Sequence, residues 1–204
     1  MFSQVKCILL NYIIVMKFLK PLLFIGLLLP IVNLFYRGTQ DDLTADPIEY
    51  ILHYTGLWSF RVLLLTLLMT PLKDLTRSTW FIKVRGMIGL YAFFYVSLHL
   101  SIYVWLDLRF DFSHLWEDIV KRPYITVGFL AWLLLVPMAI TANKKMVRKL
   151  GKKWKTLHKT IYIVTILACL HFLWLVKNDL LEPLIYAGIA FVLLFYRLIK
   201  YSRS

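Results

Sequence analysis

Six long apolar stretches, separated by short polar segments, constrain this chain more than any other feature. A helix that crosses a bilayer needs about 17–25 mostly apolar residues, and each stretch is close to that length. The stretches are Phe18–Phe35, Ile51–Thr70, Met87–Leu106, Tyr124–Ile140, Thr160–Val176 and Leu184–Ile199. The sequence therefore predicts an all-α integral membrane protein, a bundle of six transmembrane helices.

The composition agrees with this fold class. Of the 204 residues, 60% are hydrophobic, whereas soluble domains usually have about 45–50%. The net charge of +13 could indicate nucleic-acid binding, but the basic residues lie between the apolar stretches rather than on one polar face. We therefore expect membrane lipid, and no nucleic acid, around this chain. The two cysteines, Cys7 and Cys169, lie in apolar surroundings and are expected to pack rather than to form a disulfide.

Loop charges predict the orientation, because Lys and Arg accumulate in short loops on the cytoplasmic side. Acidic residues gather at 41–49, 107–118 and 179–182, and basic residues dominate the segments that alternate with these loops. The densest basic segment lies between the fourth and fifth spans and contains Lys144, Lys145, Arg148, Lys149, Lys152, Lys153, Lys155 and Lys159. The alternation predicts that both termini are cytoplasmic.

The N-terminal segment is set apart from the rest. Residues 1–15 form an apolar run that is too short to span comfortably, and Met16 would be a natural start. We therefore interpret 1–15 as a possible N-terminal extension and 16–204 as a single six-helix domain. No small-residue cleavage site follows the first span, which is expected to remain as an anchor.

Four histidines lie within or beside the apolar stretches, where ionisable groups are costly and usually functional. His53 opens the second span, and the other three are His99, His158 and His171. His99 lies a dozen residues beyond the cytoplasmic end of the third span. His158 lies close to the inner surface, and His171 follows it by 13 residues, which is about 20 Å along a helix. His99 and His171 are therefore expected at one depth on two different helices.

Two imidazoles at one depth can hold a heme iron from both faces, an arrangement suited to electron transfer. The sequence predicts this role for His99 and His171. One alternative is a pair of buried, hydrogen-bonded histidines. Another is a non-heme metal, although no carboxylate lies in these helices to complete such a site.

His158 has no histidine partner at its own depth. A site there would have one histidine and a weaker or non-protein second ligand; the alternative is an interfacial histidine without a cofactor. On a straight helix, His158 and His171 would project roughly 140° apart. Either the helix tilts, or it begins only after His158.

Two arginines are further candidates for cofactor binding. Arg85 stands beside Gly86 and Gly89, whose small size leaves space, and its planar fork suits a propionate or a phosphate. Arg61 lies midway along the second span, where lipid exposure of a charge is costly. It is expected to face the bundle interior, near a heme propionate or a quinone site. Tyrosine hydroxyls, backbone carbonyls and snorkelling are the alternatives.

Several segments in a fixed order carry a resemblance to a known family. They are Thr66–Leu72, Arg85–Leu90 leading to Leu98-His99-Leu100, Lys121–Gly128, Leu150–Trp154 with Leu157-His158 and Tyr162, and finally His171. Together they resemble the MsrQ family, the heme-binding membrane subunits of the bacterial periplasmic protein-methionine-sulfoxide reductase, within the ferric-reductase-like transmembrane domains. The family often has Arg-Arg where this chain has Val84-Arg85, and Thr-Ser where it has Thr141-Ala142.

The resemblance implies an electron-transfer subunit that is not catalytic alone. Under it, His99, His158 and His171 are ligands of heme iron or line heme sites, with one or two hemes b and an associated flavin mononucleotide (FMN). Electrons would come from the quinone pool or a cytoplasmic flavin reductase. They would pass across the bacterial inner membrane to a periplasmic molybdenum-cofactor subunit that reduces methionine sulfoxide, for repair of oxidised periplasmic proteins.

Two other functions stay open from the residues. The chain could be the heme subunit of another membrane reductase or dehydrogenase, such as a metal-ion reductase. It could also be a non-redox transporter or assembly factor, in which the histidines relay protons or pack.

Overall fold

Six helices of the computed structural model are long and apolar enough to cross a membrane. The structure describes residues 18–176 and 179–202, and the predicted extension at 1–15 lies outside them. The six spans are Phe18–Thr39, Pro47–Thr76, Trp80–Asp107, Pro123–Ile140, Lys152–Leu175 and Leu181–Ser202. The predicted fold class is confirmed, and each span covers its predicted stretch to within one residue, extending up to eight residues beyond it.

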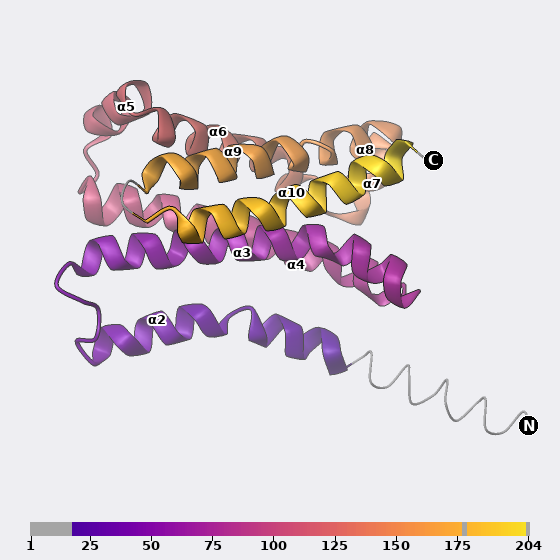
Figure 1. Ribbon diagram of the computed structural model, residues 1–204, viewed down its shortest axis with the longest axis horizontal. Coiled ribbons are helices and arrows are strands. Elements are labelled where there is room, and N and C mark those ends of the chain that lie inside the picture. Colours follow the sequence, from indigo (N-terminus) through magenta and orange to yellow (C-terminus); the bar gives the residue numbers. More distant parts are fainter. Residues whose placement is uncertain (1–17, 177–178, 203–204) are drawn as a thin grey trace, which may run out of the picture.

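The spans are built from the helices labelled in Figure 1. In chain order these are α2 (Leu29–Thr39), α3 (Pro47–Thr76), α4 (Trp80–Ile102), the π-helix η1 (Tyr103–Asp107), α5 (Phe112–Lys121), α6 (Pro123–Ile140), α7 (Lys144–Leu150), α8 (Lys152–His158), α9 (Ile161–Leu175) and α10 (Leu181–Ser202). Residues 18–26 are also helical and lead into α2 through a turn at 27–28. The described residues contain no strand.

Local sequence signals explain where several of these helices begin and end. Asp46 caps α3, since its side chain accepts a hydrogen bond from the Glu49 N–H at 3.0 Å, and Pro47 occupies the first turn, where its missing N–H costs nothing. The helix ends at Arg77 in the left-handed conformation. Gly151, at φ 51°, separates α7 from α8, because glycine adopts positive φ without a Cβ clash.

Two helix pairs form the centre of the bundle, α3 with α4 and α6 with α9, and α10 lies against both α3 and α9 (Figure 1). The first span lies on the outside and is held by hydroxyl groups. The hydroxyls of Tyr91 and Tyr95 donate to the carbonyls of Phe24 and Leu27, at 3.0 and 2.7 Å. The Leu27 carbonyl belongs to the turn at 27–28, and the Phe24 carbonyl lies one helical turn before it.

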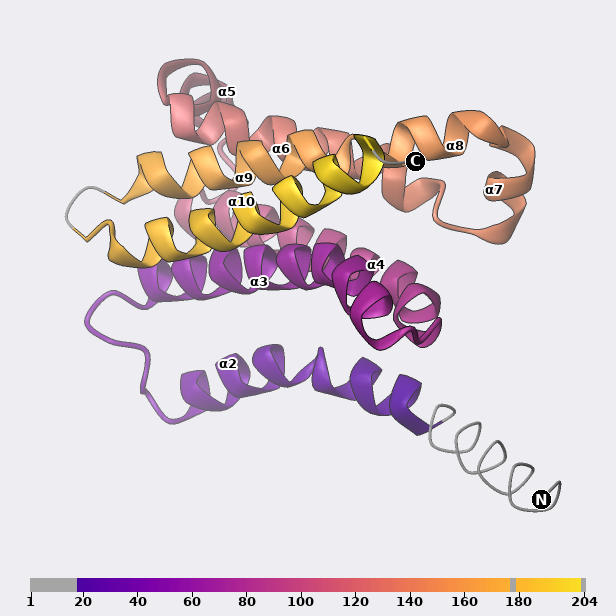
Figure 2. The ribbon, with the colours of Figure 1, turned by 45° about the vertical axis from the view of Figure 1, so that its right-hand side comes forward.

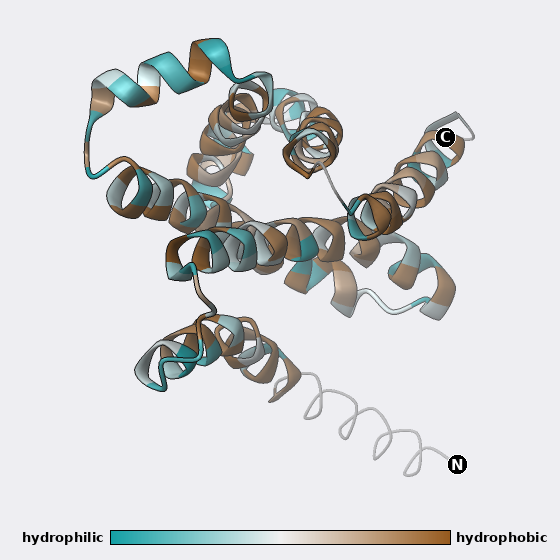
Figure 3. Cartoon of the chain, turned by 60° about the vertical axis from the view of Figure 1, so that its left-hand side comes forward, coloured by the Kyte–Doolittle hydropathy of each residue, from teal (hydrophilic) through white to brown (hydrophobic). Residues whose placement is uncertain are grey.

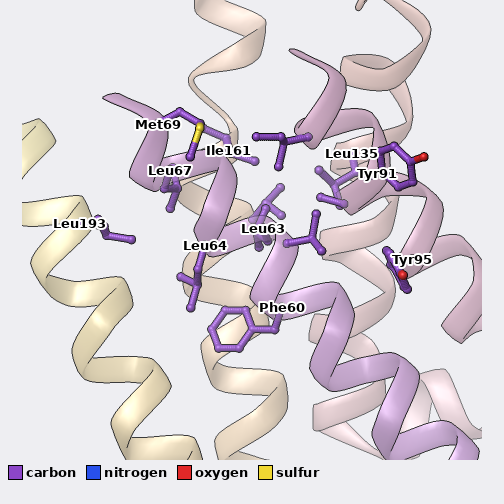
Figure 4. Close-up of a cluster of buried hydrophobic side chains, with 14 of the residues drawn as sticks. Phe60, Leu63, Leu64, Leu67, Met69, Tyr91, Tyr95, Leu135, Ile161 and Leu193 are labelled. Atoms are coloured by element: carbon purple, nitrogen blue, oxygen red, sulfur yellow. The ribbon is translucent and has the colours of Figure 1, made fainter. Parts of the chain in front are cut away.

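Buried apolar side chains fill the space between the pairs. Figure 4 shows this cluster, with Leu63 at its centre and Leu67 and Leu135 close by. Many large apolar side chains are exposed instead on the outer faces of the helices, which appear brown in Figure 3. Such faces suit a chain that is surrounded by lipid.

The helix that carries His158 and His171 is broken between them. α8 ends at His158 and α9 begins at Ile161, so the alternative in which the fifth helix begins after His158 is the one found. α7 and α8 form a hairpin that projects from the end of the bundle near the C-terminus (Figure 2).

The first and last described residues lie at the same end of the bundle (Figure 1). We call this the basic end, because the α7–α8 hairpin with its seven Lys and Arg residues belongs to it. The opposite, acidic end carries the short helix α5 and the acids of the 41–49 loop. The structure contains no membrane, so the cytoplasmic position of the basic end stays a prediction.

Candidate cofactor sites

His99 of α4 and His171 of α9 face each other between the two helix pairs. Their ring centres are 6.3 Å apart, and the ring planes make an angle of 74°. The prediction that the two histidines share one depth is therefore confirmed. A bond between a metal ion and an imidazole nitrogen is about 2 Å long, so two imidazoles on opposite faces of one ion have ring centres roughly 6 Å apart.

Hydrogen bonds at Nδ1 set the protonation of both rings. His171 Nδ1 lies 2.7 Å from the Tyr124 carbonyl, which only accepts, so Nδ1 carries the proton. His99 Nδ1 lies 3.3 Å from Thr55 Oγ1, and that hydroxyl donates to the Ile51 carbonyl at 2.8 Å. Both Nε2 atoms are therefore left with a lone pair, the state that binds a metal.

Each histidine ring packs against a glycine of the partner helix in its pair. A Cβ added at Gly128 would lie 2.7 Å from His171 Nδ1, and one added at Gly56 would lie 3.2 Å from His99 Cε1. The α3–α4 pair thus contributes Gly56 with His99, and the α6–α9 pair contributes Gly128 with His171. Sequence reasoning did not single out Gly56 or the role of Gly128, because it could not know which helices are paired.

A cavity of about 520 Å³ surrounds the two rings and is mainly apolar. Within the described ranges, no group of three or more His, Cys, Asp or Glu side chains could hold a bare metal ion. His99 and His171 are thus the metal-ligating side chains of this cavity. The cavity, the free Nε2 atoms and the ring spacing would suit these two residues to hold a heme.

The acidic end closes over this cavity with α5. Leu115 and Ile119 line the cavity, whereas Phe112, Trp116 and Val120 are exposed. Asp118 anchors the helix, since it accepts from the Tyr103 hydroxyl and pairs with Arg122 at 2.9 Å. The sequence predicted a loop between the third and fourth spans, and the helix α5 within it was not predicted.

Charged groups outside the membrane stabilise the start of α5. Asp111 caps the helix by accepting from the backbone N–H groups of Ser113 and His114, at 3.0 and 3.2 Å. Hydrogen bonds from Ser113 and from the His114 ring hold the pKa of Asp111 well below its usual range. His114 Nδ1 lies 2.8 Å from the Asp111 carboxylate, and this hydrogen bond raises the pKa of His114.

A second cavity, of about 510 Å³, lies toward the basic end and contains His158. His158 Nδ1 lies 3.1 Å from the Trp154 carbonyl, and its ring stacks on the Trp154 indole with ring centres 3.9 Å apart. Gly86 and Gly89 line the same cavity, and a Cβ at Gly86 would meet open space. Leu63 and Leu135 border both cavities.

The two predicted arginines lie in different surroundings. Arg85 lines the second cavity, where its Nη1 donates to Thr70 Oγ1 at 3.4 Å. Arg61 lines neither cavity. Its Nε donates to the Tyr186 hydroxyl at 2.7 Å, and its Nη2 lies 3.8 Å from Glu182. Of the alternatives considered for Arg61, the tyrosine hydroxyl is the partner found.

Comparisons with known proteins agree with this architecture. Residues 55–169 match the family model described as "Ferric reductase like transmembrane component". This range contains His99, Gly128 and His158. The chain is also 55% identical over 161 residues, 79% of this chain and 74% of the relative, to the "Protein-methionine-sulfoxide reductase heme-binding subunit MsrQ" of Xanthomonas campestris pv. campestris strain 8004.

The chain belongs to the MsrQ family. A second member, from Bordetella pertussis and with the same printed name, is 43% identical over 187 residues, 91% of each chain. Two MsrQ family members of different origin thus match this chain across most of its length, as the resemblance in sequence had indicated. The six helices and the family together identify a multi-pass membrane protein.

Proposed function

We propose that this chain is the membrane electron-transfer subunit of a methionine sulfoxide reductase, and that it holds a heme b between His99 and His171. The observation that carries the proposal is the facing pair of imidazoles, 6.3 Å apart, with a lone pair on each Nε2. The names of the relatives, which describe heme-binding subunits, support the same reading.

The residues of the chain would position the cofactor and keep it dry. When bound, a heme supplies one-electron redox chemistry. The Tyr124 carbonyl and the Thr55 hydroxyl orient the two rings. A hydrogen bond at Nδ1 also increases the basicity of the Nε2 atom that would bind the metal. The apolar walls and α5 would keep water from the iron, which is one of the means by which a protein sets a redox potential.

The direction of transfer follows from the predicted orientation. With the basic end in the cytoplasm of a bacterial inner-membrane protein, electrons would enter from the quinone pool or from a cytoplasmic flavin reductase. They would leave at the acidic end, toward a periplasmic molybdenum-cofactor subunit that reduces methionine sulfoxide. An acidic surface there would steer a partner that has a basic docking face. The proposal also includes a second heme at His158 and an associated FMN, because the family resemblance implies both.

Visible spectroscopy of the purified protein tests the heme proposal. We expect a dithionite-reduced minus oxidised spectrum of the b type, and His99→Ala and His171→Ala should each abolish the same spectral component. His158→Ala should leave that component in place. The proposal fails if the wild-type protein, produced with ample heme, carries none, or if neither His99→Ala nor His171→Ala changes its spectrum.

A further inference from the structure

The short helix α5 at the acidic end has apolar side chains on two separate faces. Leu115 and Ile119 form the inner face, which lines the first of the two cavities. Phe112, Trp116 and Val120 recur every four residues and so form a second face, the apolar face of α5. Their side chains point away from the cavity and are 66, 69 and 64% exposed. Exposure of this extent needs an explanation, because large apolar side chains gathered on one surface usually mark a contact with lipid or protein.

Polar side chains complete the circumference of this helix. Ser113, Glu117 and Lys121 are exposed and also recur every four residues, so they form a polar face. Successive residues of an α-helix are about 100° apart around its axis, which places the apolar face between the inner face and the polar face. A helix with this order of faces suits a position where it contacts protein, lipid and water at the same time.

The covalent neighbours of α5 set its level relative to the spans. The third span ends at Asp107, and α6 begins at Pro123, two residues after the end of α5. Near the start of α6, the Thr126 hydroxyl donates to the Ile119 carbonyl. Figure 3, which looks toward the acidic end, shows α5 lengthwise across that end. The helix therefore lies where the third span ends and the fourth begins, at the boundary between lipid and water.

Two further aromatic side chains are exposed in the segment that leads into α5. They are Trp105 of η1 and Phe110 of the following loop. Trp105 belongs to the third span, whose exposed apolar side chains are those that lipid surrounds. Tryptophan is typical of the level at which a span leaves the bilayer. The apolar face of α5 thus continues a surface that already suits lipid, and lipid is the occupant that it fits.

We propose that α5 is an interfacial helix: its apolar face inserts into the lipid at the acidic end, and this contact holds the inner face over the first cavity. Asp118 accepts a hydrogen bond from the Tyr103 hydroxyl and so fastens α5 to η1. Lipid supplies the contact on the apolar side of the helix. The bilayer thereby becomes part of what closes the cavity, whether or not a heme lies between His99 and His171.

Spin labels on adjacent faces test the position of α5 in nanodiscs of phosphatidylcholine. In a full chain whose native cysteines are replaced, a nitroxide would be attached at Trp116→Cys on the apolar face or at Glu117→Cys on the polar face. The label at 116 should be reached by oxygen, which concentrates in lipid, and protected from a water-soluble nickel chelate. The label at 117 should show the reverse. The proposal is overturned if the chelate reaches both labels equally, as on a surface left free for a protein partner, or if both reagents are excluded at 116, as in contact with a second copy of the chain.

Amide exchange in the same nanodiscs, at one constant pH, tests whether lipid holds the helix in place. Trp116→Gln should accelerate exchange of residues 113–121 by about tenfold or more, the order of the contribution of one buried large apolar side chain. Glu117→Gln is the matched control, because its ion pair with Lys121 is exposed, and exchange should change by no more than about twofold. Unchanged exchange in the buried part of α3 shows that each variant has folded. If exchange in Trp116→Gln equals that of the wild-type protein, lipid does not hold α5 and the proposal is overturned.

Discussion

At the scale of single residues, two glycines determine whether the histidines can face each other. Gly128 and Gly56 lie directly beneath the rings of His171 and His99. A side chain at either position would displace the histidine ring that it meets and so change the gap between the two rings. The arrangement of the histidines therefore depends on two residues that carry no functional group.

Alanine substitution of these glycines should damage the site in a graded order. Gly128→Ala, whose Cβ would lie 2.7 Å from His171 Nδ1, should cost more than Gly56→Ala, whose nearest contact would be 3.2 Å. Overpacking of this kind typically costs about 1–3 kcal/mol. We expect heme per chain to fall most in Gly128→Ala. Gly188→Ala, which meets nothing within 4 Å, is the matched control, and equal heme content in all three variants would contradict the role of the glycines.

Some of these residues could be predicted from the sequence and others could not. His99 and His171 were predictable because depth follows from helix rise and from the position of charged loops. The roles of Thr55 and Gly56 depend on which helices lie side by side, and hydropathy does not contain that information. Arg61 was expected to face the bundle interior, but its side chain is partly exposed, and its tyrosine partner on α10 depends on tertiary packing.

At the scale of elements, the helices that were missed are short and amphipathic. Spanning helices can be predicted from their length and apolar content. By contrast, α5 has only 10 residues of mixed polarity. A segment this short forms a stable helix only through capping and packing. The break after His158 was one of two alternatives in the sequence. It takes His158 off the straight axis of α9, so His158 and His171 lie on separate helices, α8 and α9.

The cap of α5 should make this helix sensitive to pH in two directions. The pKa of His114 is raised, so its contribution to stability is complete below its unfolded value of about 6.5 and is lost as pH rises through the folded value. The pKa of Asp111 is lowered, so its contribution is present above about 3.9 and is lost as pH falls through the folded value. Amide exchange of residues 113–121, corrected for intrinsic rates, should be slowest between about pH 4 and 6.5.

Substitution of the histidine tests the origin of that pH dependence. In His114→Gln the corrected exchange rates should no longer change between pH 6 and 8.5, because the titrating partner of Asp111 is gone. Exchange of α5 that accelerates equally with pH in the variant and the wild-type protein would show that another group is responsible.

At the scale of the whole molecule, the two ends of the bundle differ both in charge and in the cavity that lies near each. One cavity opens toward the acidic end and the other toward the basic end, and Leu63 and Leu135 form the wall that they share. The six spans and the charge alternation were readable from the sequence, because both follow from the cost of burying polar groups in lipid. The cavities could not be predicted from the sequence, because their position depends on how the two helix pairs pack against each other.

Cysteine labelling tests the predicted orientation of these two ends. In a chain whose native cysteines are replaced, Gln40→Cys in the loop before α3 should react with a membrane-impermeant maleimide in spheroplasts. Lys145→Cys on α7 should react only after permeabilisation, because basic loops stay in the cytoplasm. Both positions are exposed, so accessibility within the protein does not bias the comparison. The reverse pattern of labelling would show that the topology is inverted.

The division of the two histidines between separate helix pairs has a consequence for how the protein is made. A heme bound by both rings would link the α3–α4 pair to the α6–α9 pair. It would thus connect two parts of the chain that enter the membrane one after the other. The first half is inserted before the second ligand has been synthesised. If the chain holds heme as proposed, the supply of heme during insertion would be a step in the maturation of the bundle. Without heme, helix packing alone would hold the two halves together.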